Sequence, residues 1–270
     1  MKSAFDPVGL EEYYLDYINK KNEENYQKRY VGKEKYYHAS GAGFCSRKLY
    51  YQSVEKAKPT NETPSLGKMK MRFGSIFHDD FQNALSDTYI KTSYINTNDI
   101  NIKEKDKVLY KKKVKFHVEQ EIIIPDLNVR GFYDVVAEQQ EDDETRIYLY
   151  DLKTIASYPW MRKFGRSITD TSENYKLQLG TYGAAVKEQF GRLDGMYLYF
   201  YNKDTSQIRN VFVSDNYVNL ARNYWRNIQR EHAKGLPQFI KGISPAEQWA
   251  CGYCEFLDHC NPPDYKNKKR

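Results

Sequence analysis

Residues 131–153 read GFYDVVAEQQEDDETRIYLYDLK, and this stretch decides the fold that we expect for the whole chain. Its second hydrophobic run, 147–150, is rich in β-prone residues and predicts a buried strand. Residues two apart on a strand point to the same face of a sheet. We therefore expect Asp151 and Lys153 to project together, while Leu152 points back into the core.

The acidic turn at 140–145 separates this strand from the hydrophobic run that follows Asp134. A polar turn between two β-prone runs predicts a hairpin, which would return Asp134 to the neighbourhood of Asp151. Two carboxylates and an ammonium group would then meet at one end of a sheet, and carboxylates suit Mg²⁺ or Mn²⁺. A lysine beside such an ion can orient or deprotonate a water, or stabilise charge on a phosphate. The alternative is a surface strand with an ordinary Asp/Lys ion pair.

The composition is that of one large domain, or of one domain with a small annex, because 40% of the 270 residues are hydrophobic and 29% are charged. The net charge of +6 is compatible with a polyanionic partner. Most of the 25 tyrosines are expected to be half-buried packing residues, and a few could stack on bases.

The first residues, MKSAFDP, contain no apolar core of a secretory signal, and no stretch approaches the length of a membrane span. We therefore expect a cytoplasmic protein that has no membrane partner.

The other elements follow from periodicity, turn residues and breakers. Helices are expected at about 9–30, just after Cys45, at 68–90, at 173–190, and from a cap at Ser214 and Asp215 to about 234. Residues 56–66 are expected to form a linker or mobile loop. Strands are expected at about 108–124, 128–138, 146–153, 194–202 and 207–213. This order predicts an α/β core with a mixed sheet. The helix at 68–90 should have an apolar side made of Met71, Ile76, Phe77, Phe81, Ala84 and Leu85.

Three further polar residues on predicted helices are candidates for the same site. His78 could be a ligand for Mn²⁺ or Fe²⁺, although a lone histidine on a helix is more often a surface or packing residue. Gln178 and Tyr182 are four residues apart and share a helix face. They could hold a phosphate or position the amine of Lys153, and the alternative is a polar pair on a half-buried helix.

The four cysteines predict a thiolate site: Cys251, Cys254 and Cys260 follow a C-x2-C-x5-C pattern, while Cys45 stands alone far upstream. Disulfides are not expected in a chain without a secretory signal. Four thiolates suit structural zinc, although zinc sites usually pair two short C-x2-C units. Four thiolates with uneven spacing also suit a [4Fe–4S] cluster, so the spacing leaves both groups open.

Taken together, these pieces resemble the iron–sulfur branch of the PD-(D/E)xK superfamily of nucleases, which includes the RecB/AddB-like nucleases and the CRISPR-associated RecB-like exonuclease family. The resemblance covers about residues 40–261. It rests on six pieces that stand in the order of that family: Cys45 with Arg47 and Tyr50-Tyr51, the helix from Gly74 to His78, Gly131-x-x-Asp134, Asp151-Leu152-Lys153, Gln178-x-x-x-Tyr182, and C-x2-C-x5-C. The chain departs from the pattern at Tyr133 and Ser46, where proline is frequent.

The resemblance implies a restriction-endonuclease-like core, a central mixed β-sheet flanked by helices. It also implies a role for each matching residue. Metal ligands for Mg²⁺ or Mn²⁺ would be His78, Asp134, Asp151 and the carbonyl of Leu152. The catalytic set would be Asp134, Asp151, Lys153, Gln178 and Tyr182. The [4Fe–4S] ligands would be Cys45, Cys251, Cys254 and Cys260, and the resemblance thereby favours iron–sulfur over zinc.

The function that this reading predicts is a metal-dependent DNA nuclease, acting as an exonuclease on single strands or DNA ends. The expected organisation is a helical segment at 1–66 that carries Cys45, a nuclease core at 67–235, and a cluster segment with a basic tail at 236–270. Because no G-x4-G-K-[ST] motif is present, any helicase would be a separate protein, as would recombination or spacer-adaptation partners. The rival interpretation is a non-catalytic factor that binds DNA ends or assists assembly in a nucleoprotein complex.

Overall fold

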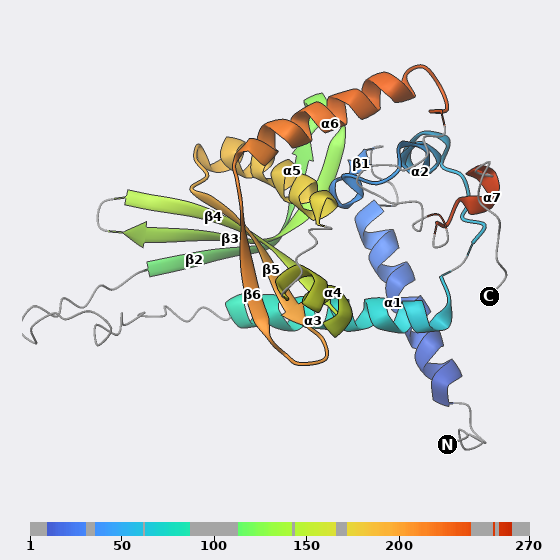
Figure 1. Cartoon of the computed structure of the whole chain (residues 1–270), viewed down its shortest axis with the longest axis horizontal. Coiled ribbons are helices and arrows are strands. Elements are labelled where there is room, and N and C mark those ends of the chain that lie inside the picture. Colours follow the sequence, from blue (N-terminus) through green and yellow to red (C-terminus); the bar gives the residue numbers. More distant parts are fainter. Residues whose placement is uncertain are drawn as a thin grey trace, which may run out of the picture.

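The computed structural model describes residues 10–30, 36–61, 63–86, 113–141, 144–165, 172–238, 251 and 254–260. Within them, a six-stranded mixed sheet lies between helices on its two faces (Figure 1). This arrangement confirms the α/β class that the order of helices and strands predicts.

The helices and strands follow the predicted order with shifted ends. The described helices are α1 (Leu10–Tyr30), α2 (Ser46–Tyr50), α3 (Ser65–Ser86), α4 (Ser157–Phe164), α5 (Glu173–Phe190), α6 (Asn216–His232) and α7 (Leu257–Cys260), with short turns η1 (Ala39–Gly41), η2 (Tyr51–Glu55) and η5 (Pro125–Leu127). The described strands are β1 (Tyr37–His38), β2 (Lys113–Ile124), β3 (Val129–Glu141), β4 (Glu144–Ile155), β5 (Gly195–Asn202) and β6 (Ile208–Val213).

Several predicted boundaries are corrected by the structure. Helix α3 begins at Ser65 rather than 68, and 87–90 and 108–112 lie outside the described residues. The hairpin turn is shorter than expected, because the strands continue to a Glu141–Glu144 pair. Helix α6 has no cap from the side chain of Asp215; instead, the hydroxyl of Ser214 accepts a hydrogen bond of 3.3 Å from the first helical N–H.

The sheet runs in the order β1-β3-β4-β5-β6, and β2 pairs with the other edge of β3. The β2–β3, β3–β4 and β5–β6 pairs are antiparallel, while β1–β3 and β4–β5 are parallel. Parallel strands need a crossover, and α4 and α5 provide the one between β4 and β5.

Strand β3 changes partner along one edge. Residues 129–130 pair with β1 and residues 135–141 pair with β4, while β2 follows β3 along its other edge. Residues 131–134 therefore have no strand partner on the β1/β4 side. Past Tyr150, β4 continues alongside β5 only. The sheet thus forks at the stretch that decides the fold.

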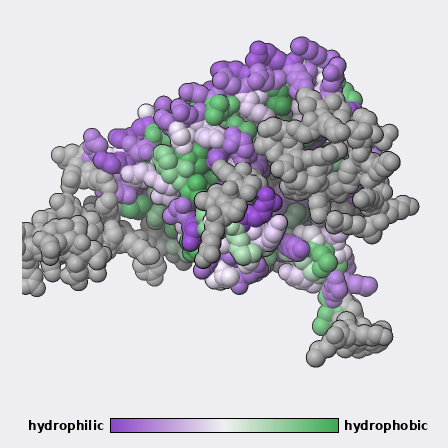
Figure 2. All heavy atoms as spheres, in the orientation of Figure 1, coloured by the Kyte–Doolittle hydropathy of each residue, from purple (hydrophilic) through white to green (hydrophobic). Residues whose placement is uncertain are grey.

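The main core lies between the sheet and the pair of helices α5 and α6, which cover one face together (Figure 1). Trp225 of α6 is fully buried there, and its indole N–H donates a hydrogen bond of 2.9 Å to the Thr181 hydroxyl. The backbones of α5 and α6 approach closely at Gly180, where an added Cβ would lie 2.2 Å from the carbonyl oxygen of Tyr217. The outer side of α6 is hydrophilic (Figure 2), as expected for an amphipathic surface helix.

Helix α3 covers the opposite face of the sheet through two aromatic contacts. Phe77 stacks on Tyr201 with ring centroids 4.3 Å apart, and Phe81 contacts Tyr199 at 5.1 Å. The predicted apolar side is only partly correct, because Met71 is 57% exposed and Ile76 is 44% exposed. Burial therefore varies along the helix, and Gln82, which contacts Glu119 of β2, is only 8% exposed.

The described residues contain no helix that is long and apolar enough to span a membrane.

Candidate active site

Two buried aspartates lie where strands β3 and β4 stop pairing. Asp134 is 8% exposed and Asp151 is 1% exposed. The Oδ2 atom of Asp134 accepts a hydrogen bond of 2.7 Å from the backbone N–H of Leu152. This bond occupies an N–H that has no partner strand on that side, so it holds the Asp134 carboxylate next to the Asp151–Lys153 segment. The structure shows the Leu152 N–H in this contact and does not test the predicted role of its carbonyl.

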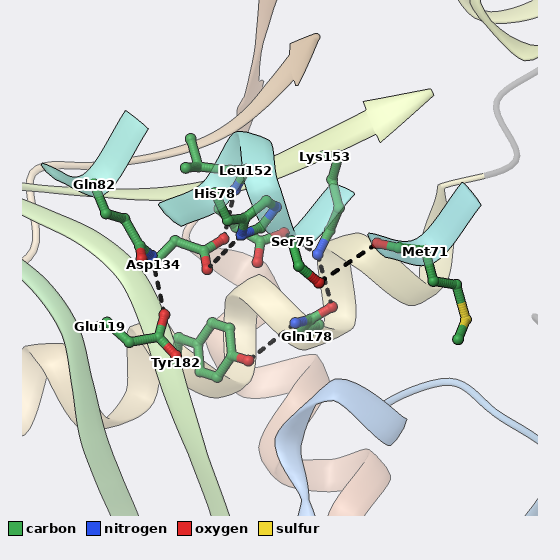
Figure 3. A network of polar contacts seen from close by, with 11 residues as sticks. Met71, Ser75, His78, Gln82, Glu119, Asp134, Leu152, Lys153, Gln178 and Tyr182 are labelled. Atoms are coloured by element: carbon green, nitrogen blue, oxygen red, sulfur yellow. Dashed lines mark hydrogen bonds and ion pairs between the residues drawn. The ribbon is translucent and has the colours of Figure 1, made fainter. Parts of the chain in front are cut away.

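Lys153 connects the aspartates to helix α5. Its Nζ lies 2.7 Å from Asp151 Oδ2 and donates a hydrogen bond of 3.1 Å to Gln178 Oε1. The Nε2 of Gln178 donates in turn to the Tyr182 hydroxyl at 2.9 Å (Figure 3). The expected pairing of Asp151 with Lys153 on one face, and of Gln178 with Tyr182 one helical turn apart, is therefore observed, and Leu152 is buried as predicted.

His78 approaches Asp134 from helix α3. Its Nδ1 lies 3.4 Å from Asp134 Oδ1, and the ring faces the carboxylate in Figure 3. Burial would lower the pKa of His78, but the contact with Asp134 raises it overall. Burial would raise the pKa of Asp134, whereas His78, Lys153 and the Leu152 N–H together lower it. The two groups therefore favour an ion pair.

Asp151 has the opposite pKa shift. Burial, with the nearby charge of Asp134, raises the pKa of Asp151 to about 6, although Lys153 lowers it in part. Burial would lower the pKa of Lys153, but Asp151 and Asp134 raise it. The carboxylate of Asp134 is therefore ionised throughout the neutral pH range, whereas that of Asp151 takes up a proton at about pH 6.

The structure allows a test of whether these residues fit a divalent cation. No three His, Cys, Asp or Glu side chains among the described residues form a ready-made metal-binding group. However, Asp151 Oδ2 is buried, and it makes an ion pair of 2.7 Å with the Lys153 ammonium. A buried carboxylate oxygen beside a second carboxylate and an imidazole fits a divalent cation, which would compete with the ammonium for that oxygen. Shared ligation requires the imidazole of His78 to be neutral, because a metal takes the place of a proton on the nitrogen that binds it.

Sequence reasoning missed Glu119, which lies on β2 opposite Asp134 at the one gap in the β2–β3 register. Its φ of +47° is unusual for a residue with a side chain and is a type of strain that clusters at functional sites. The Oε2 of Glu119 accepts a hydrogen bond of 2.9 Å from Gln82 of α3 (Figure 3). The sequence contains no signal for this backbone conformation.

A second missed residue is Tyr175, one helical turn before Gln178. The Nζ of Lys153 lies 4.9 Å from the centroid of its ring, in a cation–π contact. The i, i+3 spacing to Gln178 could have indicated that Tyr175 shares the face of α5 that meets Lys153.

The cysteine segments lie against each other, although they are far apart in sequence. Tyr51, six residues after Cys45, donates a hydrogen bond of 3.1 Å to the carbonyl of His259 and contacts the ring of Phe256. The predicted linker is also tied down, because the N–H groups of Thr60 and Asn61 donate to the carbonyl of Glu255 at 2.8 and 3.2 Å.

All four cysteines are free thiols of intermediate exposure. Burial raises the pKa values of Cys251, Cys254 and Cys260, and Cys45 raises each of them further. The thiols of Cys251, Cys254 and Cys260 are thus near enough to Cys45 to interact with it electrostatically. No three of the four form a ligand group within the described residues. Four cysteines suit zinc or iron–sulfur by their chemistry alone.

Comparisons with known proteins agree with this geometry. A family model described as the PD-(D/E)XK nuclease superfamily matches residues 100–261. The matched range contains both aspartates, Lys153 and the Gln178/Tyr182 pair, and it leaves out His78 and Cys45. No curated protein matches the chain.

Two solved structures are similar to the chain. The crystal structure of SSO0001 aligns with a TM-score of 0.50 and 17% identity, covering 96% of this chain and 99% of that chain. A candidate exonuclease from Eubacterium rectale aligns with a TM-score of 0.28 and 14% identity, covering 85% of this chain and 68% of that chain. At such identities the likeness to SSO0001 concerns the fold alone. The fold, a mixed sheet flanked by helices, is consistent with a restriction-endonuclease-like core.

Proposed function

The chain belongs to the PD-(D/E)XK nuclease superfamily, and from this premise we propose that it is a metal-dependent deoxyribonuclease that acts as an exonuclease on single strands or DNA ends. The observation that carries the proposal is the arrangement at the fork of the sheet. Asp134, Asp151 and Lys153 come together there with two carboxylates buried side by side, and a divalent cation would add to the charge compensation that Lys153 and His78 provide.

The cation that we propose is Mg²⁺ or Mn²⁺, held by Asp134, Asp151 and His78 with the Leu152 carbonyl. The support is the burial of both carboxylates and the proximity of His78 to Asp134. When bound, such a cation supplies Lewis-acid activation of water and neutralises charge on the scissile phosphate.

The residues of the chain supply the remaining roles. Lys153 is held with its ammonium between Asp151 and Gln178, where it can stabilise the charge that develops on the phosphate. Gln178 and Tyr182 position that ammonium from α5. In the hydrolysis, the oxygen of a water forms a bond to phosphorus, one phosphorus–oxygen ester bond breaks, and the departing sugar oxygen takes up a proton.

We also propose that Cys45, Cys251, Cys254 and Cys260 hold a [4Fe–4S] cluster, as the resemblance to the RecB/AddB-like iron–sulfur branch and its CRISPR-associated members implies. The support is the electrostatic influence of Cys45 on the other three free thiols and the contact of Tyr51 with the segment before Cys260. The cluster would join the segment at 1–66 to the segment at 236–270 across the nuclease core at 67–235.

The experiment that tests the function is cleavage of end-labelled DNA by anaerobically purified protein in Mg²⁺ and in Mn²⁺. Single-stranded, double-stranded and circular substrates separate exonuclease from endonuclease activity, and blocking one end or the other gives polarity. Metal-dependent release of nucleotides from free ends is the expected result. Binding of DNA ends without cleavage of any substrate in either metal would favour the rival end-binding function.

A further inference from the structure

A cavity of about 480 Å³ opens at Asp134, and residues of α1, α3, α5, η1, β1, β2 and β3 line it. Its lining includes Asp134, His78 and Tyr182 of the candidate active site. It also includes Arg130 and Phe132, which the mechanism above does not use. The cavity therefore extends the site along β3 toward its first residues.

Arg130 is an unusual member of this lining because it is only 6% exposed and one of its donors has no partner. Its Nε donates to the Oε1 of Glu121 on the neighbouring strand β2. Its Nη2 is buried and has no hydrogen-bond partner among the described residues. Leaving a charged donor buried and unpaired destabilises a fold, so such a group is expected to have a ligand.

The position of Arg130 relative to the aspartates follows from the pleat of the strand. Arg130, Phe132 and Asp134 alternate along β3 and share one face. Their Cα atoms are spaced so that Arg130 lies about 13 Å from Asp134 along the strand. The guanidinium also lies over the ring of Phe132, 5.6 Å from its centroid, which fixes its plane.

We propose that Arg130 binds a backbone phosphate of the nucleic-acid strand at a position next to the one being cleaved. This inference rests on the proposed nuclease function and adds a substrate contact to it. A guanidinium matches the geometry of phosphate oxygens better than an ammonium does, and the contact carries no base specificity. Glu121 holds the Nε side, so the orientation of the group is set before the strand enters.

The test measures binding of a labelled single-stranded oligonucleotide in EDTA, where no cleavage occurs, from 50 to 200 mM salt. Arg130→Gln should weaken binding about tenfold, and it should reduce the slope of log K against log salt by about 0.7, the value for one phosphate contact on a single strand. Arg130→Lys should keep the slope and weaken binding less, because it keeps the charge without the fork of donors.

Inorganic phosphate as a competitor distinguishes a site for free anions from one that needs the strand. Displacement of the oligonucleotide at millimolar phosphate would overturn the strand assignment.

Two matched variants separate a ligand role from a structural one. Glu121→Gln breaks the same ion pair but leaves the guanidinium, so its salt slope should equal that of the wild type. Arg192→Gln breaks a surface Arg–Asp pair outside the cavity lining and should change neither affinity nor slope. The proposal is overturned if Arg130→Gln keeps the wild-type slope, or if Glu121→Gln lowers affinity and slope equally. DNA binding by folded Arg130→Gln can be measured even if the wild type cuts no DNA. The binding result therefore tests the role of Arg130, and the cleavage assay tests the proposed function separately. If Arg130→Gln does not fold, Arg130→Lys with unchanged affinity overturns the proposal.

Discussion

The Asp134 carboxylate of β3 accepts a hydrogen bond of 2.7 Å from the backbone N–H of Leu152 on β4. Both residues lie beyond the point where the pairing of β3 with β4 ends. This contact joins the two arms of the forked sheet at the point where β3 exchanges β1 for β4. It also places the Asp134 carboxylate one residue from both Asp151 and Lys153 along β4. The fork, rather than the hairpin alone, therefore explains why these three side chains share one site.

Lys153→Ala should reduce cleavage at least about a hundredfold while leaving metal and DNA binding largely intact. An ammonium that stabilises the transition state contributes to turnover more than to ground-state affinity. Single-turnover cleavage and oligonucleotide binding measure the two effects separately. Lys163→Ala is a suitable control, because that lysine lies on α4 and contacts Ser172 rather than the aspartates. Cleavage by Lys153→Ala at the wild-type rate in saturating metal would contradict the assignment.

Metal affinity should depend on pH through Asp151. The pKa of Asp151 is about 6, so this carboxylate is protonated below pH 6 and ionised above it. Protons compete with the cation for the ionised form of Asp151 and for the neutral form of His78, whose pKa is raised, so Mn²⁺ affinity should rise about tenfold or more per pH unit below 6 and should continue to rise through neutral pH. Titration of Mn²⁺ binding from pH 5 to 8 measures this dependence.

Asp151→Asn is the matched variant for that titration, since it keeps the size of the side chain and removes the titrating group. It should bind Mn²⁺ weakly and should keep only the part of the pH dependence that His78 contributes. A wild-type affinity that stays flat from pH 5 to 8 would show that Asp151 does not bind the cation in its ionised form.

His78→Ala should have a milder effect than loss of either aspartate, and it should alter the choice of metal. Imidazole is a softer ligand than carboxylate and favours Mn²⁺ over Mg²⁺. The ratio of cleavage rates in the two metals should therefore move toward Mg²⁺ in this variant. An unchanged ratio would mean that His78 acts only on Asp134, as in the contact that the structure shows.

Much of the site could be predicted from the sequence because it depends on short-range rules. The alternation of a strand places Asp151 and Lys153 on one face, and the helical turn does the same for Gln178 and Tyr182. The polar turn predicted the hairpin, although its exact length could not be predicted, since acidic residues occur in strands as well as in turns. Burial of the helices was less predictable, as the exposed Met71 shows, because it depends on which turn of α3 crosses the sheet.

The residues that the sequence did not reveal depend on tertiary structure. Glu119 adopts a left-handed backbone conformation that no local propensity favours, and it is identified only by its place opposite Asp134. Arg130 shares a face with Asp134 by simple alternation, but its unpaired Nη2 is defined only once Glu121 is in place. These groups become visible when the neighbouring strands and the cavity are known.

Gly131→Ala should destabilise the protein by about 1–3 kcal/mol, the usual cost of overpacking. An added Cβ would lie 2.6 Å from the Cβ of Ala39 and 3.0 Å from Cε1 of Tyr182, so β3 and α5 would have to move apart. Cleavage should fall as well, because Tyr182 would be displaced. Thermal unfolding and cleavage rates measure both effects. The double variant with Ala39→Gly removes the closer clash and should recover part of the stability; no recovery would place the strain elsewhere.

Cys260→Ala should disconnect the two ends of the chain. If the four cysteines bind a [4Fe–4S] cluster, anaerobically purified wild-type protein should be brown, with broad absorption near about 400 nm and stoichiometric iron. Because Cys45 lies far upstream of the other ligands, the cluster closes a very long loop, and its loss should lower the melting temperature. The contacts of Tyr51 with His259 and Phe256 should loosen, exposing the C-terminal segment to protease.

Lys48→Ala is the control for this variant, because it breaks an ion pair with Glu255 at the same contact and leaves the thiols, so it should keep the colour. Colourless wild-type protein with stoichiometric zinc would replace the cluster by a zinc site, and a Cys260→Ala variant with unchanged melting and proteolysis would show that the metal group does not join the segments.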